Sequence, residues 1–264
     1  MKIHATIGML TYNSEKNLAR ALASVKDFTE IIVADGGSTD ATLDIAAACG
    51  ARVISQSNPG HTIGDFAQER NLTLAAAAQP WFFYLDSDEI MSPELVKHIR
   101  TVANDSAHQY GAYRVRYLKT NADASKIHRT FNEYYQLRLV RTDIGAHFER
   151  PVHERIIVPT AVLVGQIESP WYVPLDADDL SLLVAPKKIW KRAGMEAGET
   201  WKVYNLKNAF MSIVGVPCVR IAKSLFKMVA VKVRYGEDAI PARYELLRIL
   251  YTCFLSAQCF RRLW

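Results

Sequence analysis

Strand and helix signals alternate through the first hundred residues, and this alternation limits the possible folds more than any other feature. Four short apolar runs are typical of buried strands: 3–10, 30–34, 51–55 and 81–85. Three intervening segments carry apolar residues at helical spacing: 13–25, 38–49 and 65–78. Asn13 and Ser14 are the expected caps of the first helix. Strands separated by helices of this length form βαβ units, so we predict an α/β fold, a mostly parallel sheet with helices on both faces.

Two carboxylates, Asp86 and Asp88, directly follow the fourth predicted strand. Ligands of open parallel sheets bind beyond the carboxyl ends of the strands. Paired carboxylates at that edge suit a divalent cation that completes its shell with substrate phosphates and water. A second Asp-x-Asp triplet, at Asp176 and Asp178, precedes an apolar run, where an Asp is explained most simply as a helix cap. The sequence therefore favours Asp86 and Asp88 as a site for Mg²⁺ or Mn²⁺.

Further polar residues fall near the same predicted edge. They are Thr11, Tyr12 and Asn13 after the first strand, Asp35 after the second, and Arg70 in the third helix. Asp35 offers a carboxylate to a hydrogen-bond donor of a base or sugar, and Arg70 can pair with a phosphate as a planar fork. Together these segments predict a site for a nucleoside diphosphate. Taken singly, the Asp35 segment also fits a turn with a helix cap, and Arg70 also fits an ion pair with Glu69 or Asp65.

The pattern changes after about residue 105. Two segments, 111–120 and 134–142, alternate like antiparallel strands, and 154–164 is a candidate for another. We therefore expect a nucleotide-binding half at 1–105 and a second half of the same domain at 106–185. The remaining residues, 186–264, are predicted to form a helical extension.

Charge separates this extension from the rest of the chain. Residues 1–185 carry 17 Lys and Arg against 22 Asp and Glu, whereas residues 186–264 carry 15 against 5. The basic residues are interleaved with long apolar runs, a pattern that disfavours nucleic acid as a partner. Apolar faces with cationic flanks are typical of helices in a membrane interface, so we predict contact with an anionic membrane surface. A helical cap packed on the domain is the alternative.

The cysteines and the longest apolar stretches indicate the cellular compartment of the protein. The four cysteines have no metal-ligand spacing, which favours free thiols in a reducing cytosol. The apolar run near the N-terminus ends within a few residues and lacks a small-residue cleavage site, so we expect a strand and not a signal peptide. The longest uncharged stretches late in the chain, 208–219 and 249–260, are too short to span a bilayer.

Several segments, in this order and at these intervals, resemble family 2 glycosyltransferases. TYNSEKNLARALASV, IIVADGGSTDAT, ERN and FFYLDSDEIMSPEL resemble the nucleotide-sugar-binding half of that family. The later YYQLRLVR and PVHERI resemble the branch that contains lipopolysaccharide core β-1,4-glucosyltransferases. The resemblance implies a GT-A type fold and inverting transfer of a hexose, glucose in that branch, from a UDP-sugar. It also implies a lipid-linked or lipopolysaccharide-core acceptor at the cytoplasmic face of a bacterial inner membrane.

The resemblance also implies a role for each matching residue. Asp35 would read the nucleobase, and Thr11, Tyr12 and Asn13 would line the same pocket. Arg70 would lie near the diphosphate. Asp86 and Asp88 would form the donor and metal motif, with Asp88 as the direct metal ligand. Glu154 would be the general base, with His153 as its neighbour or substitute, because inverting transfer must remove a proton from the acceptor hydroxyl. An ion pair of Glu154 with Arg150 or Arg155 on a strand is the alternative.

The chain departs from that branch in places and leaves other functions open. Gly36 stands where related sequences often carry a second acidic residue, and Trp171-Tyr172 stands where the branch usually carries His-Tyr. A catalytically silent scaffold at the membrane would keep the same sheet. So would a sugar nucleotidyltransferase, but that class typically has a Gly-rich basic loop after the first strand, and LTYNSEKN contains no glycine.

Overall fold

The computed structural model describes residues 2–61, 63–105, 109–175, 186, 189–190, 193–197 and 215–261. The chain forms two compact units, the first made of Met1–Leu118 and Glu133–Pro174, the second of Lys119–Asn132 and Leu175–Trp264. The division into 1–105, 106–185 and 186–264 stays a prediction. Asp176 and Asp178, the predicted helix cap, lie outside the described residues.

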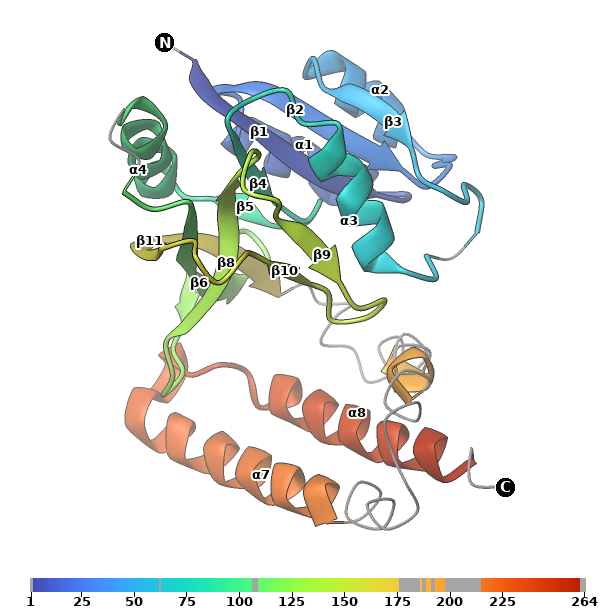
Figure 1. The fold of residues 1–264 in the computed structure, drawn as a ribbon. Helices are drawn as coiled ribbons and strands as arrows, with labels where there is room; N and C mark the ends of the chain where they lie inside the picture. Colours follow the sequence, from blue (N-terminus) through green and yellow to red (C-terminus); the bar gives the residue numbers. More distant parts are fainter. Residues whose placement is uncertain are drawn as a thin grey trace. The chain divides into compact units, whose positions relative to one another are not determined.

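The first unit is built on a mixed sheet (Figure 1). Its parallel strands are β1 (Ile3–Thr11), β2 (Phe28–Asp35), β3 (Arg52–Ser55) and β4 (Trp81–Tyr84), in the order β3-β2-β1-β4. The sheet continues beyond β4 through β8 (Tyr134–Arg141), β6 (Ala112–Asn121), β11 (Val164–Leu175) and β5 (Ile90–Met91). β8 runs antiparallel to β6, as the alternating sequence predicts, and it also runs antiparallel to β4. The four expected parallel strands are therefore confirmed.

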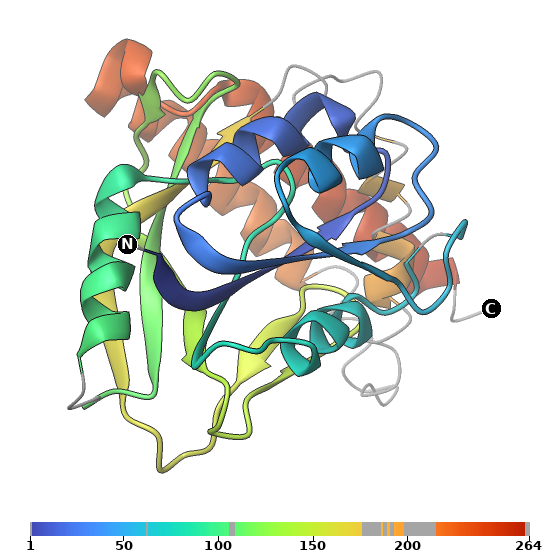
Figure 2. The ribbon, with the colours of Figure 1, turned by 90° about the horizontal axis from the view of Figure 1, so that it is seen from above.

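Helices cover both faces of the parallel strands (Figure 2). They are α1 (Glu15–Ser24), α2 (Thr42–Ala48), α3 (Phe66–Ala75) and α4 (Pro93–Asn104). The side chains of β4 alternate between the two faces: Trp81 and Phe83 pack with α1, α2 and α4, whereas Phe82 and Tyr84 pack with α3. Burial on both faces explains why β4 is a continuous apolar run in the sequence.

Three details of the first unit differ from the sequence predictions. Ser14 precedes α1 but makes no side-chain capping hydrogen bond, and Asn13, at φ 47°, instead accepts a hydrogen bond from the Thr39 amide. The candidate strand at 154–164 is interrupted: β10 (Arg155–Ile157) pairs with β9 (His147–Glu149), and β11 begins only at Val164. Helix α4 was not predicted from the sequence, although Ser92 caps it and Pro93 begins it.

The second unit holds two long C-terminal helices that lie side by side (Figure 1). They are α7 (Val216–Tyr235) and α8 (Ala242–Arg261), joined through the short 3₁₀ helix η2 (Gly236–Asp238). β7 (Ile127–His128) pairs with the end of β6 in this unit. Within the described part of the chain, no helix combines the length and the apolar character needed to cross a membrane.

Candidate active site

The predicted donor-site segments meet at the carboxyl ends of β1, β2 and β4. Thr11 and Asp35 are register partners at the ends of β1 and β2. The Thr11 hydroxyl donates to Asp35 Oδ1 over 2.8 Å. The hydroxyls of Ser14 and Ser87 lie 3.2 Å apart, which ties the loop after β1 to the Asp86–Asp88 turn after β4. The shared edge expected from the strand order is therefore present.

Asp35 organises the loop that follows β2. Its Oδ1 accepts hydrogen bonds from the Thr11 and Ser38 hydroxyls, and its Oδ2 accepts from the amides of Gly37 and Ser38. A carboxylate has about four acceptor sites, and this loop uses that number. Burial raises the pKa of Asp35, but the hydrogen bonds from Ser38, Thr11 and Gly37 outweigh burial and hold the pKa below its ordinary value. Asp35 therefore stays ionised at neutral pH and fixes the backbone of the loop.

The two residues that follow Thr11 have different roles in the structure. The Asn13 amide donates to the Ser38 hydroxyl over 2.8 Å, so Asn13 joins the loops after β1 and β2. The Tyr12 side chain is 52% exposed, and its ring is open to a ligand at the strand edge. Contact of a nucleobase with Asp35, and with the pocket formed by Thr11, Tyr12 and Asn13, stays a prediction.

The sequence ERN, residues 69–71, forms three separate links on α3. Glu69 accepts a hydrogen bond from the Ser57 amide, over 3.0 Å. Asn71 donates to the Phe148 carbonyl and accepts from the Phe148 amide, over 3.0 and 2.8 Å. The Asn71 clamp fixes β9 against α3, which brings the following loop, with His153 and Glu154, toward Arg70.

Arg70 lies buried between two carboxylates. Its Nη2 pairs with Asp86 Oδ1 and its Nε with Glu154 Oε1, the latter over 3.3 Å. Its guanidinium lies over the Tyr84 ring, 5.0 Å from the centroid. Arg70 thus joins the strand-end motif to the proposed base across 84 residues of sequence. The alternative ion pairs considered above are therefore wrong. Arg70 pairs with Asp86 and Glu154 instead of Glu69 or Asp65. Glu154 pairs with Arg70 instead of Arg150 or Arg155.

A second buried pair, between Glu89 and Arg138, was not identified from the sequence. Arg138 Nη1 and Nη2 donate to Glu89 Oε2 and Oε1 over 2.9 and 3.1 Å, and Glu89 Oε2 also accepts from the Asp86 amide. Arg138 is stacked on Tyr84 and on Trp171, at 4.0 and 4.4 Å from the ring centroids. Burial lowers the pKa of Arg138, but the nearby charges, that of Glu89 foremost, outweigh burial and raise the pKa above its ordinary value. The pair fixes the turn that carries Asp86, and Trp171 belongs to this packing.

Breaking the Glu89–Arg138 pair is expected to destabilise the protein strongly. Glu89→Gln leaves the Arg138 charge buried without its counterion, which costs about 3–5 kcal/mol of unfolding free energy. Glu133→Gln is the matched control, because Glu133 pairs with Arg116 at a position where its side chain is 61% exposed, and it should cost below about 1 kcal/mol. Denaturant unfolding of both variants measures the difference, and equal losses would contradict a structural role for the buried pair.

The acidic residues of the turn fit a divalent cation. Asp88 is exposed, and the Asp86 side chain is 41% exposed while it pairs with Arg70. Over the described ranges, no three His, Cys, Asp or Glu side chains gather as a metal site. Mg²⁺ and Mn²⁺ accept a site with one or two carboxylates, in which substrate phosphates and water complete the shell. The donor set therefore suits a cation that arrives with a diphosphate.

A cavity of about 580 Å³ adjoins these groups. It is lined by Asp86, His153 and Glu154 together with residues of β6, β8 and β10. His153 has φ 54°, and this left-handed conformation belongs to the turn between β9 and β10. The structure thus brings both candidate bases to the cavity that Asp86 reaches.

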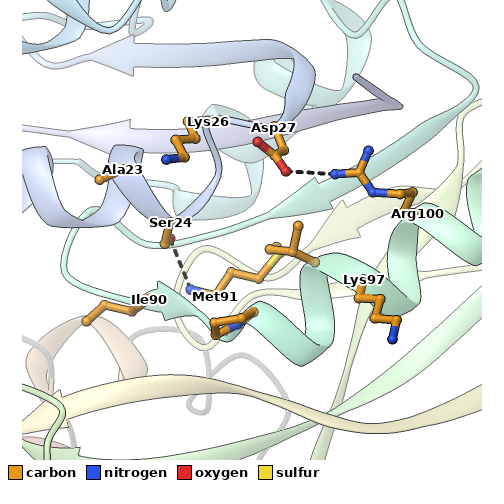
Figure 3. Close-up of a pocket in the computed structure, with 10 residues that line it drawn as sticks. Ala23, Ser24, Lys26, Asp27, Ile90, Met91, Lys97 and Arg100 are labelled. Atoms are coloured by element: carbon orange, nitrogen blue, oxygen red, sulfur yellow. Dashed lines mark hydrogen bonds and ion pairs between the residues drawn. The ribbon is translucent and has the colours of Figure 1, made fainter. Parts of the chain in front are cut away.

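Another cavity, of about 490 Å³, is lined by none of the residues at the carboxyl ends of β1, β2 and β4 (Figure 3). It is formed by the end of α1, the residues before β2, β5 and the first turns of α4. Arg100 and Asp27 form an ion pair at its edge, and the Met91 amide donates to the Ser24 hydroxyl. None of the residues assigned from the sequence lines this cavity.

Two solved structures have a fold similar to that of this chain. Residues 1–349 of TarS from S. aureus, in complex with UDP-GlcNAc, align with 99% of this chain and 92% of that one, at a TM-score of 0.52 and 17% identity. The mannosyltransferase PcManGT from Pyrobaculum calidifontis, in complex with GDP-Man and Mn²⁺, aligns with 100% of this chain and 88% of that one, at a TM-score of 0.54 and 14% identity. At these identities the likeness concerns the fold alone, which is of GT-A type.

Sequence relatives match part of the chain. A TPR repeat-containing protein of Synechococcus elongatus is 34% identical over 61% of this chain, and an uncharacterized glycosyltransferase of Rickettsia typhi is 34% identical over 42% of it. The match covers 37% of the length of each of these relatives. The family model described as glycosyl transferase family 2 matches residues 6–157. The chain therefore belongs to glycosyl transferase family 2.

Proposed function

We propose that this chain is an inverting glycosyltransferase that moves a hexose from a nucleoside diphosphate sugar to an acceptor hydroxyl. The observation that carries the proposal is the Asp86–Arg70–Glu154 cluster, which joins the strand-end carboxylates to a carboxylate that lines a cavity. The family membership and the nucleotide-sugar complexes of the fold neighbours TarS and PcManGT add support. UDP-glucose as donor, and a lipid-linked or lipopolysaccharide-core acceptor, complete the proposal.

In the proposed reaction, the acceptor hydroxyl oxygen forms a bond to the anomeric carbon of the donor. The bond between that carbon and the diphosphate oxygen breaks, and its electron pair leaves with the diphosphate. Glu154 takes the hydroxyl proton as general base. Its Oε1 accepts from Arg70 Nε, which orients the carboxyl group toward the cavity. His153 lines the same cavity and is the substitute base.

The other assigned residues form the donor side. Asp88 and Asp86 would hold Mg²⁺ or Mn²⁺, which supplies positive charge to the leaving diphosphate when it is bound. Asp35 would read the nucleobase from the loop that it organises, and Thr11, Tyr12 and Asn13 would line the same pocket. Arg70 retains one buried nitrogen, Nη1, without a hydrogen-bond partner in the described part of the chain, and a donor phosphate oxygen is a suitable acceptor for it.

Donor binding is the direct test. The melting temperature of the purified protein is measured with UDP, UDP-glucose, UDP-GlcNAc and GDP-mannose, with and without Mn²⁺. A ligand at 100 times its dissociation constant stabilises the folded state by about 2.7 kcal/mol. We expect a metal-dependent shift that is largest with UDP-glucose. A folded protein that responds to no nucleotide would support the scaffold instead, and formation of a sugar nucleotide from a sugar phosphate would support the nucleotidyltransferase.

We also propose that α7 lies on the cytoplasmic face of an anionic membrane. Val219, Phe226 and Val233, spaced by seven residues, lie along one side of the helix and are 53%, 71% and 82% exposed. Cationic side chains follow on the adjacent side at spacings of three, four and seven residues: Arg220, Lys223, Lys227 and Arg234. An apolar stripe beside a cationic one is complementary to acyl chains beneath anionic headgroups.

Vesicle binding tests the α7 surface. Phe226→Ser with Val233→Ser should lower partition into vesicles of phosphatidylglycerol and phosphatidylcholine by at least about tenfold, because each side chain gains roughly 1.5–3 kcal/mol on full burial. Val53→Ser is the matched control, because Val53 is an exposed valine on β3. Binding that is unchanged in the double variant, or equal on vesicles without anionic lipid, would contradict the proposal.

A further inference from the structure

Two arginines without carboxylate partners line the cavity beside Glu154. Arg114 on β6 and Arg155 on β10 both reach this cavity and are exposed. Within the described residues, neither side chain forms a hydrogen bond or an ion pair with the protein. The other arginine of the cavity, Arg138, is committed to Glu89. The cavity therefore offers two guanidinium groups, from different strands, that the described part of the chain leaves without an anion.

The charge of this region contrasts with the rest of the chain around it. The charged residues that line the cavity are the three arginines 114, 138 and 155 and the two carboxylates 86 and 154. These side chains leave one net positive charge at the cavity. Residues 1–185 as a whole are acidic, with 17 Lys and Arg against 22 Asp and Glu. Arg70 and Arg138 are held by the carboxylates, so the excess positive charge lies with Arg114 and Arg155.

We infer that the acceptor carries a phosphate group, which Arg114 and Arg155 bind while its hydroxyl lies at Glu154. This inference rests on the proposed function of the same site. Guanidinium groups form paired, charge-assisted hydrogen bonds to phosphate oxygens. Two of them, arriving from different strands, match an anion with several oxygens and up to two charges. A neutral sugar alone would leave both charges without a partner.

The size and position of the cavity fit such an acceptor. Its volume of about 580 Å³ lies within the range of small-molecule sites, roughly 300–1,000 Å³. Glu154 and Arg155 are consecutive residues that both line it, so the proposed base and one phosphate ligand share a wall. A phosphate held there fixes the distance between the anion and the hydroxyl that reacts. Arg114 and Arg155 are therefore specificity-determining residues for the acceptor.

Binding of phosphorylated and neutral sugars tests this inference without requiring the natural acceptor. The probes are inorganic phosphate, glucose 1-phosphate, glucose 6-phosphate, glucuronate and glucose. Their dissociation constants are measured calorimetrically with the donor site saturated by UDP and Mn²⁺. We expect at least one phosphorylated probe to bind at least tenfold more tightly than both glucose and glucuronate. We also expect Arg114→Gln with Arg155→Gln to weaken that binding by about 10- to 100-fold.

Arg116→Gln is the matched control, because Arg116 lies two residues from Arg114 on β6 and pairs with Glu133. It should leave both phosphate and UDP binding within twofold of the wild type. The double variant should likewise keep its affinity for UDP. If UDP binds but phosphorylated sugars bind no better than glucose, or if the double variant binds them like the wild type, this inference is wrong. Absence of UDP binding would instead overturn the proposed function.

Discussion

Asp88→Asn is expected to lower the rate of sugar transfer by about 10²–10³-fold at saturating donor. Asp88 is the most exposed carboxylate of the turn, because the Asp86 side chain is 41% exposed and Glu89 is buried. Its charge is therefore the one best placed to hold a cation against the donor diphosphate. Initial rates measured over a Mn²⁺ titration should show both a lower maximum and a weaker apparent affinity for the metal.

The control for this substitution is Asp44→Asn, because Asp44 is an exposed carboxylate on α2. It should leave the rate and the metal dependence unchanged. Both substitutions lie on the surface, so the free energy of unfolding should change by no more than about 0.5 kcal/mol in either variant. Full transfer activity of Asp88→Asn at saturating metal would remove Asp88 from the mechanism.

Glu154→Gln is expected to lower transfer by about 10²–10⁴-fold, the usual contribution of a general base. Glutamine keeps an oxygen that can accept from Arg70 Nε, so the position of the side chain and the affinity for UDP should be preserved. The variant loses only the ability to take the acceptor proton. The rate and the UDP dissociation constant, measured on the same sample, separate the loss of chemistry from the loss of binding.

His153 supplies the comparison for Glu154. Both residues line the cavity, but Glu154 is the one fixed by Arg70. We therefore expect His153→Gln to cost less than about tenfold in rate, well below the loss expected for Glu154→Gln. The reverse pattern, a large loss in His153→Gln with an active Glu154→Gln, would assign the base to His153.

Arg70 couples the Asp86–Asp88 turn to Glu154. A buried arginine held by Asp86 on one side and Glu154 on the other makes the metal motif and the base parts of one cluster. Asn71, the next residue, fixes β9 to α3 and so brings the loop that carries Glu154 to Arg70. The three consecutive residues 69–71 thus connect segments on both sides of the site, which gives the short ERN motif a physical meaning.

The sequence by itself determined the parallel half of the fold and the edge at which its polar residues meet. Apolar runs such as Trp81–Tyr84 are readable because burial on both faces requires apolar side chains at every position. Once these strands are parallel neighbours, the positions of Thr11, Asp35 and Asp86 at one edge follow from where the strands end. The helix α4 was also readable from Ser92 and Pro93, but its signals were missed.

The tertiary structure alone decided which charged residues meet. Arg70 pairs with Glu154 across 84 residues, and Glu89 pairs with Arg138 across 49. The sequence suggested partners close in the chain because short-range spacing is all that a local pattern contains. The hydrogen bonds of Asp35 also depend on the tertiary structure. Thr11 can donate to Asp35, beside Ser38 and Gly37, only because β1 and β2 end at the same edge of the sheet. Periodicity reflects burial, which is local, whereas ion pairs depend on where distant segments converge.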